Sequence, residues 1–155
     1  MTELLRLGVA VDTNVLVYAE GEGDAERCMA ARDVLARLPT GDVVLPSQVL
    51  GELHRVLTRR ARRSAQEARD AVLAWADVFR VRDSTWVALQ AAMDLHADHQ
   101  MQIWDGLVLA VAAEHRCRIL LSEDLQHGFT WRGVSVVNPF APNRHPLLEQ
   151  VLPTR

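Results

Sequence analysis

The sequence predicts a single α/β domain in which helices cover both faces of a parallel sheet. Two observations support this class. Short apolar runs alternate along the chain with longer segments whose apolar residues recur at helical spacing, which is the pattern of βαβ units. The chain has 155 residues, of which 49% are hydrophobic and 24% charged, so its length and composition are those of one globular domain with its own core.

The expected strands are short apolar runs rich in β-branched residues. The first run ends at Asp12, where a charged side chain interrupts an apolar stretch that resumes at Val15. An unpaired charge between two buried segments is costly, so this position needs an explanation. In chain order, the five strands are expected at residues 7–11, 43–45, 79–81, 118–121 and 134–137.

The expected helices are marked by N-cap residues and by apolar stripes. Asp24 is placed to cap one helix, and Ser64 with Glu67 three residues later has the spacing of a capping box. The helices are expected at residues 14–19, 24–38, 46–57, 64–78, 83–97 and 104–114, with a last turn near 147–151.

One domain is expected to cover residues 1–155, with a core at about 7–140 and an irregular tail at 141–155. No run is long and apolar enough to span a membrane. The N-terminus lacks the basic region and apolar stretch of a signal peptide. The two cysteines, Cys28 and Cys117, show no pairing pattern, so we expect reduced thiols and a cytoplasmic protein.

Four acidic residues lie beside apolar runs rather than on open polar faces. Taken singly, each has an ordinary explanation as a helix N-cap, a solvent-facing side chain, an acid in a first helical turn or a turn residue. They are Asp12 after the first strand, Glu52 in SQVLGELHRVL, Asp105 in MQIWDGLVLAVAAEH and Asp124 in ILLSEDLQHG.

Taken together, the four acids indicate a metal site. The carboxyl ends of neighbouring parallel strands meet at one edge of a sheet, so Asp12 and Asp124 are expected side by side, near the helices that carry Glu52 and Asp105. Two carboxylates about 4 Å apart repel by roughly 4 kcal/mol at an effective dielectric constant of about 20. Protonation or a divalent cation would offset this repulsion. Oxygen ligands suit Mg²⁺ or Mn²⁺, and such sites commonly perform phosphoryl transfer.

These motifs resemble those of the PIN-domain ribonucleases, and within that family the VapC-type toxins of bacterial toxin–antitoxin pairs. The resemblance extends from Val9 to Phe140. It rests on four blocks, each of which contains one of the acids, and on the closing VVNPF. The first block is VDTNVLVYAE, the second is PSQVLGELHRVL, and the third and fourth lie together in WDGLVLAVAAEHRCRILLSEDLQHG.

The resemblance implies a PIN-like three-layer sandwich whose five-stranded parallel sheet has the order 3-2-1-4-5. It also implies an endoribonuclease that uses one or two Mg²⁺ or Mn²⁺ ions, with water as the nucleophile and products ending in 5′-phosphate and 3′-hydroxyl. As a type II toxin it would inhibit translation and growth. Its expected partners are RNA, a cognate antitoxin and a second copy of the chain, in a homodimer and a toxin–antitoxin hetero-oligomer.

The resemblance also assigns roles to individual residues. Asn14 and Ser122 carry over as polar supports of the carboxylates. Glu123 is an additional acid without an assigned role. The catalytic, metal-binding acids would be Asp12, Glu52, Asp105 and Asp124.

A stretch rich in arginine follows the second block. The net charge of −3 argues against a generally basic nucleic-acid-binding protein, so the distribution of charge matters more than its total. Two interpretations remain open for this stretch: a rim that contacts RNA phosphates or the antitoxin, or a solvated helix end whose cations suit the helix dipole. The RNA-binding candidates are Arg55, Arg59, Arg60, Arg62 and Arg63.

The tryptophans are expected to be structural. Trp75, Trp86 and Trp104 lie at apolar helical positions, which favours core packing over base stacking. Trp131 lies in a loop near Asp124, where packing is again the simpler interpretation.

Other functions remain open beside that of a toxin ribonuclease. A PIN nuclease can act in RNA or DNA processing without an antitoxin, and a PIN fold can be kept as a non-catalytic interaction module. A haloacid-dehalogenase-like phosphatase also has an Asp after its first strand. Its acid–base chemistry needs a second Asp two residues later, and this chain has Asn14 there, which argues against that class.

Overall fold

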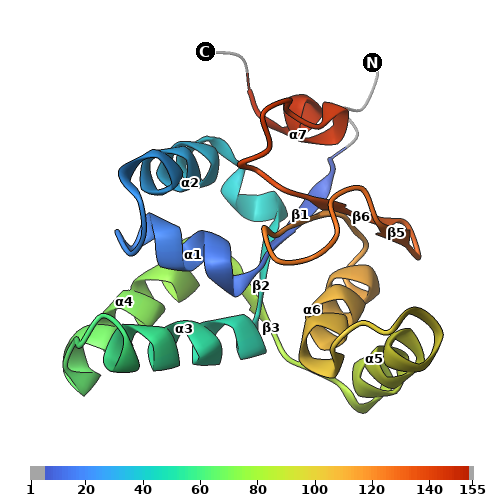
Figure 1. Ribbon diagram of the computed structural model, residues 1–155, viewed down its shortest axis with the longest axis horizontal. Coiled ribbons are helices and arrows are strands. Elements are labelled where there is room, and N and C mark those ends of the chain that lie inside the picture. Colours follow the sequence, from blue (N-terminus) through green and yellow to red (C-terminus); the bar gives the residue numbers. More distant parts are fainter. Residues whose placement is uncertain (1–5, 154–155) are drawn as a thin grey trace.

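Six strands form one twisted sheet at the centre of the computed structural model, which describes residues 6–153 (Figure 1). Their order is β3-β2-β1-β4-β6-β5, and every neighbouring pair is parallel except β5 and β6. The strands are β1 (Gly8–Val11), β2 (Val43–Pro46), β3 (Arg80–Arg82), β4 (Cys117–Leu121), β5 (Thr130–Trp131) and β6 (Val134–Val137).

The predicted parallel sheet and its strand order are confirmed, and one short strand is added. β5 forms an antiparallel hairpin with β6 through Arg132 and Gly133. Both of these residues have positive φ, of 47° and 82°, as a two-residue type I′ turn requires. Arginine is a poor signal for that conformation, which explains why this hairpin was not predicted.

Helices cover both faces of the sheet, as predicted. Figure 1 shows α1 to α4 on one side of the sheet and α5 with α6 on the other. The helices are α1 (Thr13–Ala19), α2 (Ala25–Arg37), α3 (Ser47–Arg59), α4 (Ala65–Val78), α5 (Trp86–His99), α6 (Ile103–Glu114) and α7 (Pro146–Val151), with a short 3-10 turn at Thr40–Asp42.

The core consists of the strands and the inward faces of these helices. The central strands β1 and β4 are almost entirely buried, which is usual for parallel strands covered on both sides. Leu148 and Leu152, from the C-terminal tail, also pack in this core. Cys28 and Cys117 are both buried and free, and burial raises the pKa of the Cys117 thiol to about 12.

Between residues 6 and 153 no helix has the length and apolar character needed to cross a membrane. The first five residues, on which the expectation of no signal peptide depends, lie outside the described residues, as do the last two.

The pair α5 and α6 packs closely at Gly106. A Cβ atom at Gly106 would lie 3.3 Å from both the Cα atom and the carbonyl oxygen of Ala92. The backbone of α5 therefore occupies the space that a larger side chain would need. This contact holds α6, and with it Asp105, against α5.

Replacing Gly106 by valine is expected to lower the free energy of unfolding by about 2 kcal/mol, because overpacking at a backbone contact forces the two helices apart. Urea unfolding followed by circular dichroism measures this change. Gly51→Val is the matched control, since Gly51 is a helical glycine with open space around its Cβ position. A Gly106→Val protein as stable as the control would contradict the close packing of α5 on α6.

Candidate active site

Asp12 lies at the carboxyl edge of the sheet, between β1 and α1. Its Oδ1 atom accepts a hydrogen bond of 2.8 Å from the backbone N–H of Thr13, so it caps α1. Val11 pairs with Leu121 at the end of β4, and the residues that follow these two strands therefore emerge side by side. Only 6% of the Asp12 surface is exposed, whereas Asp124 lies on the exposed loop after β4.

Asn14 and Ser122 connect these two acids. The Nδ2 atom of Asn14 lies 3.4 Å from Asp12 Oδ2 and 3.2 Å from Asp124 Oδ2. The Ser122 hydroxyl donates a hydrogen bond of 2.8 Å to Asp12 Oδ2. The two residues expected to be polar supports thus have the contacts that such a role requires.

Glu52 reaches the site from α3 and is held at both carboxylate oxygens. The Thr13 hydroxyl donates to Oε2 at 2.9 Å, and the Gln48 side-chain amide donates to Oε1 at 2.9 Å. The same amide donates to the carbonyl oxygen of Trp104 at 3.1 Å, which ties α3 to the first turn of α6. Asp105, the fourth acid, is in that turn and is partly buried.

The sequence interpretation expected Thr13, with Asn14, to start the helix and support Asp12, but it missed Gln48 and the contact of Thr13 with Glu52. Gln48 precedes Glu52 by four residues on one helix, a spacing that brings two side chains together, so a local signal existed. Thr13 is 39 residues from Glu52, and no local pattern reveals that contact.

The four acids influence one another electrostatically. Burial raises the pKa of Asp12 to about 6; hydrogen bonds from Ser122 and Thr13 oppose this increase, while the charges of Asp105 and Glu52 add to it. Burial also raises the pKa of Asp105, and the charges of Asp124 and Glu52 act in the same direction. The carboxylates are therefore close enough to disfavour one another's ionisation.

These residues fit a divalent cation in donor chemistry. All four side chains offer oxygen ligands, and within residues 6–153 none of them forms a salt bridge with an arginine. Within the described residues, however, no group of three or more His, Cys, Asp or Glu side chains is placed so that it could hold a metal ion. The fit therefore rests on the oxygen chemistry of the four acids, which is that of Mg²⁺ and Mn²⁺ ligands.

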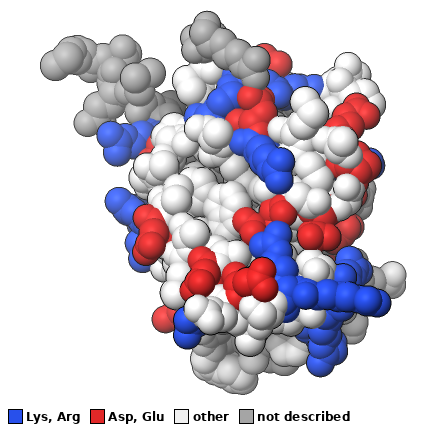
Figure 2. Space-filling view, turned by 90° about the vertical axis from the view of Figure 1, so that its left-hand side faces the viewer, with Lys and Arg blue, Asp and Glu red and all other residues white. Residues whose placement is uncertain are grey.

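Glu52, Asp105 and Asp124 open onto a groove of about 920 Å³, whereas the buried Asp12 is not among its lining residues. Figure 2 shows acidic side chains gathered in the middle of one face of the molecule, with a row of basic side chains beside them. The groove is lined by residues from α1, α3, α6 and the loops around them: Thr13, Asn14, Val17, Tyr18, Glu22, Gly23, Glu52, Arg55, Val56, Arg59, Arg60, Gln102, Trp104, Asp105 and Asp124.

The structure divides the candidate RNA-binding arginines into two groups. Arg55, Arg59 and Arg60 are exposed and line the groove. Arg62 is exposed outside it, and Arg63 forms an ion pair of 2.6 Å with Glu20. Arg63 therefore holds the turn after α3 against the end of α1, and three arginines remain available beside the acids.

Glu123 has a role that the sequence interpretation could not assign. Its carboxylate accepts hydrogen bonds from the Tyr18 hydroxyl at 2.9 Å and from Arg27 Nε at 2.6 Å. Its backbone N–H donates to Asn14 Oδ1 at 3.1 Å. Glu123 thus fixes the loop that carries Asp124 against α1 and α2.

The prediction that Trp86 and Trp104 are core residues is wrong. Trp86 is 65% exposed and Trp104 is 52% exposed. Each lies in the first turn of its helix, and α6 is apolar on nearly all sides, so periodicity could not select the inward face. Trp75 and Trp131 are partly buried and pack against the core, as expected.

Comparisons with known proteins agree with this architecture. The model of the PIN domain family matches residues 9–128. No curated protein matches the sequence.

Several solved structures share the fold. Mycobacterium tuberculosis VapC20, a toxin that cleaves the sarcin–ricin loop, has a TM-score of 0.63 and 24% identity, over 76% of this chain and 90% of that chain. A toxin–antitoxin complex from Klebsiella pneumoniae has a TM-score of 0.65 and 19% identity, over 86% and 98%. DNA-bound VapBC from Salmonella typhimurium has a TM-score of 0.61 and 15% identity, over 84% and 96%.

The raised pKa of Asp12 predicts a pH-dependent effect of Asp12→Asn on stability. Below the unfolded value of 3.8 the carboxyl is protonated in both states, and above about 6 it is charged in both. Its burial therefore lowers stability by up to about 3 kcal/mol at pH 8, and this penalty disappears as the pH falls from about 6 to 4. In a chelating buffer, Asp12→Asn is expected to raise the free energy of unfolding by about 1–3 kcal/mol at pH 8 and by much less at pH 4.

Urea unfolding at the two pH values measures this difference. Asp94→Asn, at an exposed position of α5, is the control for replacing a carboxylate at the surface. A loss of stability at pH 8 in Asp12→Asn alone would show that the charged carboxylate is stabilising, contrary to the prediction.

Proposed function

Since the chain belongs to the PIN domain family, we propose that it is a metal-dependent endoribonuclease and the toxin of a type II toxin–antitoxin pair. One observation carries the proposal: Asp12 is a buried carboxylate that forms no ion pair in the described residues, and the three further acids beside it line a groove together with Arg55, Arg59 and Arg60. Arginine binds phosphate well, and a cluster of unpaired carboxylates binds a divalent cation. Together they suit a phosphodiester substrate.

In this proposal Asp12, Asp105 and Asp124, with Glu52, hold one or two Mg²⁺ or Mn²⁺ ions. A bound ion would neutralise charge on the phosphate and lower the pKa of the attacking water. The other residues orient the ligands: Ser122 and Asn14 hold the Asp12 carboxylate, and Thr13 and Gln48 hold that of Glu52. Attack of water on the phosphorus, with departure of the 3′ oxygen as the leaving group, would leave 5′-phosphate and 3′-hydroxyl ends.

The proposed partners are RNA, a small antitoxin and a second copy of the chain, in the bacterial cytoplasm. The Klebsiella pneumoniae relative is a toxin–antitoxin complex, and the Salmonella typhimurium relative is a VapBC complex on DNA. The groove of this chain is large and charged enough to receive either a nucleic acid or an antitoxin segment. Inhibition of translation would follow from cleavage of an RNA that translation needs.

The alternative functions differ in features that can be checked. A nuclease in RNA or DNA processing would lack a short neighbouring gene for an antitoxin. A non-catalytic module has no need for a buried Asp12 next to three further acids that line a groove, and the presence of all four favours an enzyme.

Expression in a bacterial host without any antitoxin tests the proposal. The wild type is expected to arrest growth and to create discrete new 5′ RNA ends, which end-mapping across the transcriptome detects. Asp12→Asn is expected to reduce cleavage at least 100-fold, because it removes the most buried metal ligand. Purified protein in a chelator should be equally inactive and should regain activity with Mn²⁺.

Asp94→Asn serves as the matched control and should behave as the wild type. New RNA ends that persist in Asp12→Asn would overturn the assignment of the site. Normal growth and unchanged RNA with soluble wild-type protein, together with no Mn²⁺ binding, would favour the interaction module.

The arginines of the groove yield a separate prediction. The double substitution Arg59→Gln and Arg60→Gln is expected to weaken binding of single-stranded RNA by the Asp12→Asn protein. It should also reduce the slope of log affinity against log salt concentration by about 1.4, or about 0.7 for each phosphate that the protein no longer neutralises.

Fluorescence anisotropy at several salt concentrations measures both quantities. Arg69→Gln removes an arginine that is exposed but lies outside the groove, and it should leave the slope unchanged. If the slope of log affinity against log salt concentration falls equally in both variants, RNA binding depends on the overall charge of the protein rather than on this groove.

A further inference from the structure

Trp104 is exposed inside a charged groove. More than half of its surface is accessible, although it directly precedes Asp105 in the first turn of α6. Among the aromatic and cation–π contacts of the described residues, none involves its indole ring. The exposed indole ring is therefore free to contact a ligand that enters the groove, which Trp104 lines.

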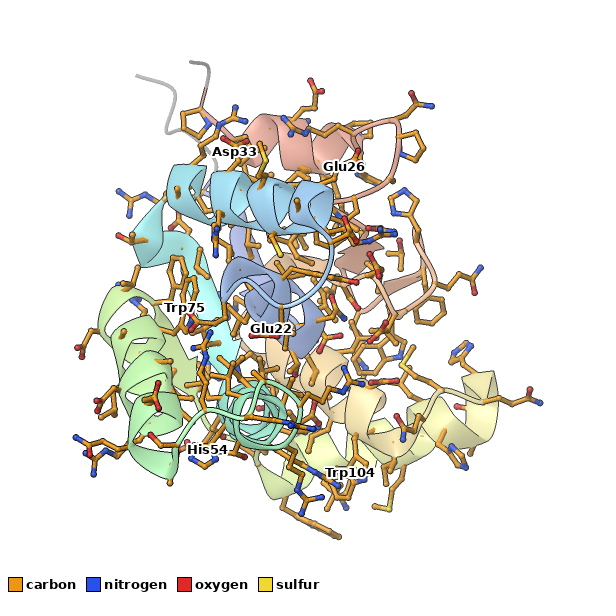
Figure 3. All side chains as sticks on the ribbon, turned by 60° about the vertical axis from the view of Figure 1, so that its left-hand side comes forward. Glu22, Glu26, Asp33, His54, Trp75 and Trp104 are labelled. Carbon is orange, nitrogen blue, oxygen red and sulfur yellow. The ribbon has the colours of Figure 1, made fainter. Side chains whose placement is uncertain are left out.

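The backbone that carries this indole ring is anchored to the acidic site. The carbonyl oxygen of Trp104 accepts a hydrogen bond of 3.1 Å from the Gln48 amide, which also holds Glu52 at 2.9 Å. Figure 3 shows Trp104 at the lower edge of the molecule, next to the ribbon of α3. The backbone that carries the ring is therefore held next to Glu52.

The lining of the groove identifies the chemistry of the ligand. Arg55 and Arg59 line the groove on α3, and Arg60 lines it at the C-cap of that helix. Trp104 lines it on α6, directly before Asp105. Arginines for phosphates and an aromatic face for a base are the combination that binds single-stranded nucleic acid. A double helix keeps its bases stacked on one another, so only an unpaired base can reach the indole ring.

We propose that Trp104 is a stacking platform for an unpaired nucleobase beside the phosphate that is cut. The proposal rests on the proposed ribonuclease function and makes it more specific: the substrate is single-stranded RNA or the loop of a folded RNA.

A protein partner is the competing occupant, and the surroundings of Trp104 favour the base. The groove has apolar lining residues, Val17 and Val56 among them, but it also holds three arginines, and these favour a ligand that carries phosphates. Trp86 and Val87 are also exposed, but they lie at the start of α5 and do not line this groove.

Two RNA probes and a matched pair of variants test the platform. The probes are a fluorescein-labelled 12-nucleotide oligoadenylate and its abasic counterpart, which has the same phosphates without bases. The full-length Asp12→Asn protein binds them without cutting. Adding Trp104→Leu is expected to weaken oligoadenylate binding roughly 10-fold, the effect of removing one base–aromatic stack, and to leave abasic binding unchanged. Trp104→Phe should restore most of the affinity, and Trp86→Leu should have no effect on either probe.

Each other outcome overturns the proposal in a recognisable way. Equally weakened binding of both probes would mean that Trp104 supports the groove rather than a base, and unchanged binding of both would mean that no base stacks there. If Trp104→Leu binds RNA normally but no longer binds an antitoxin or no longer forms a dimer, Trp104 belongs to a protein interface. If the wild type and Trp104→Leu cut RNA equally well, the proposed ribonuclease function stands and only the stacking role of Trp104 is overturned. If the wild type neither binds nor cuts RNA, both proposals fail.

Discussion

The burial of the Asp12 carboxylate is the constraint on which the rest of the site depends. A charge that is removed from water is costly unless hydrogen bonds and an opposite charge compensate for it. Hydrogen bonds from Thr13 and Ser122 supply part of the compensation, and no arginine supplies the rest in the described chain. The pKa of Asp12 therefore rises to about 6. A divalent cation would remove this penalty, and its binding would stabilise the folded protein by mass action.

The order of the strands explains how the surrounding groups reach Asp12. Because β1 and β4 are neighbours in parallel register, the loop after β4 brings Ser122 and Asp124 to the end of β1. Asn14 then touches Asp12, Ser122 and Asp124 with one amide nitrogen. An amide can donate to two carboxylates without adding charge, so it keeps repelling acids close together and leaves room for a cation.

Local patterns and long-range contacts account for what the sequence could and could not predict. The alternation of strands and helices is a local property, and so is the position of Asp12 and Asp124 at strand ends, which parallel pairing then brings together. The contact of Thr13 with Glu52 and that of Glu20 with Arg63 join residues 39 and 43 positions apart, and only the folded chain shows them. The exposure of Trp104 could not be predicted either, since α6 is apolar on almost every side and its pattern does not distinguish an inner face from an outer one.

Helix α3 shows how one amphipathic element serves both the core and the groove. Its buried residues Leu50, Leu53 and Leu57 face the sheet, and Gln48 and Glu52, with the arginines at 55 and 59, recur at spacings of four, three and four on another face. The acid lies nearer the start of the helix and the arginines nearer its end, which is the order that the helix dipole favours. The same helix can therefore hold a metal ligand next to Asp12 and extend a cationic wall away from it. A phosphodiester chain lying along this wall would meet arginines at its flanking phosphates and carboxylates at only one of them. In the proposed ribonuclease, the cleaved phosphate would therefore be the one nearest the start of α3, where Glu52 lies.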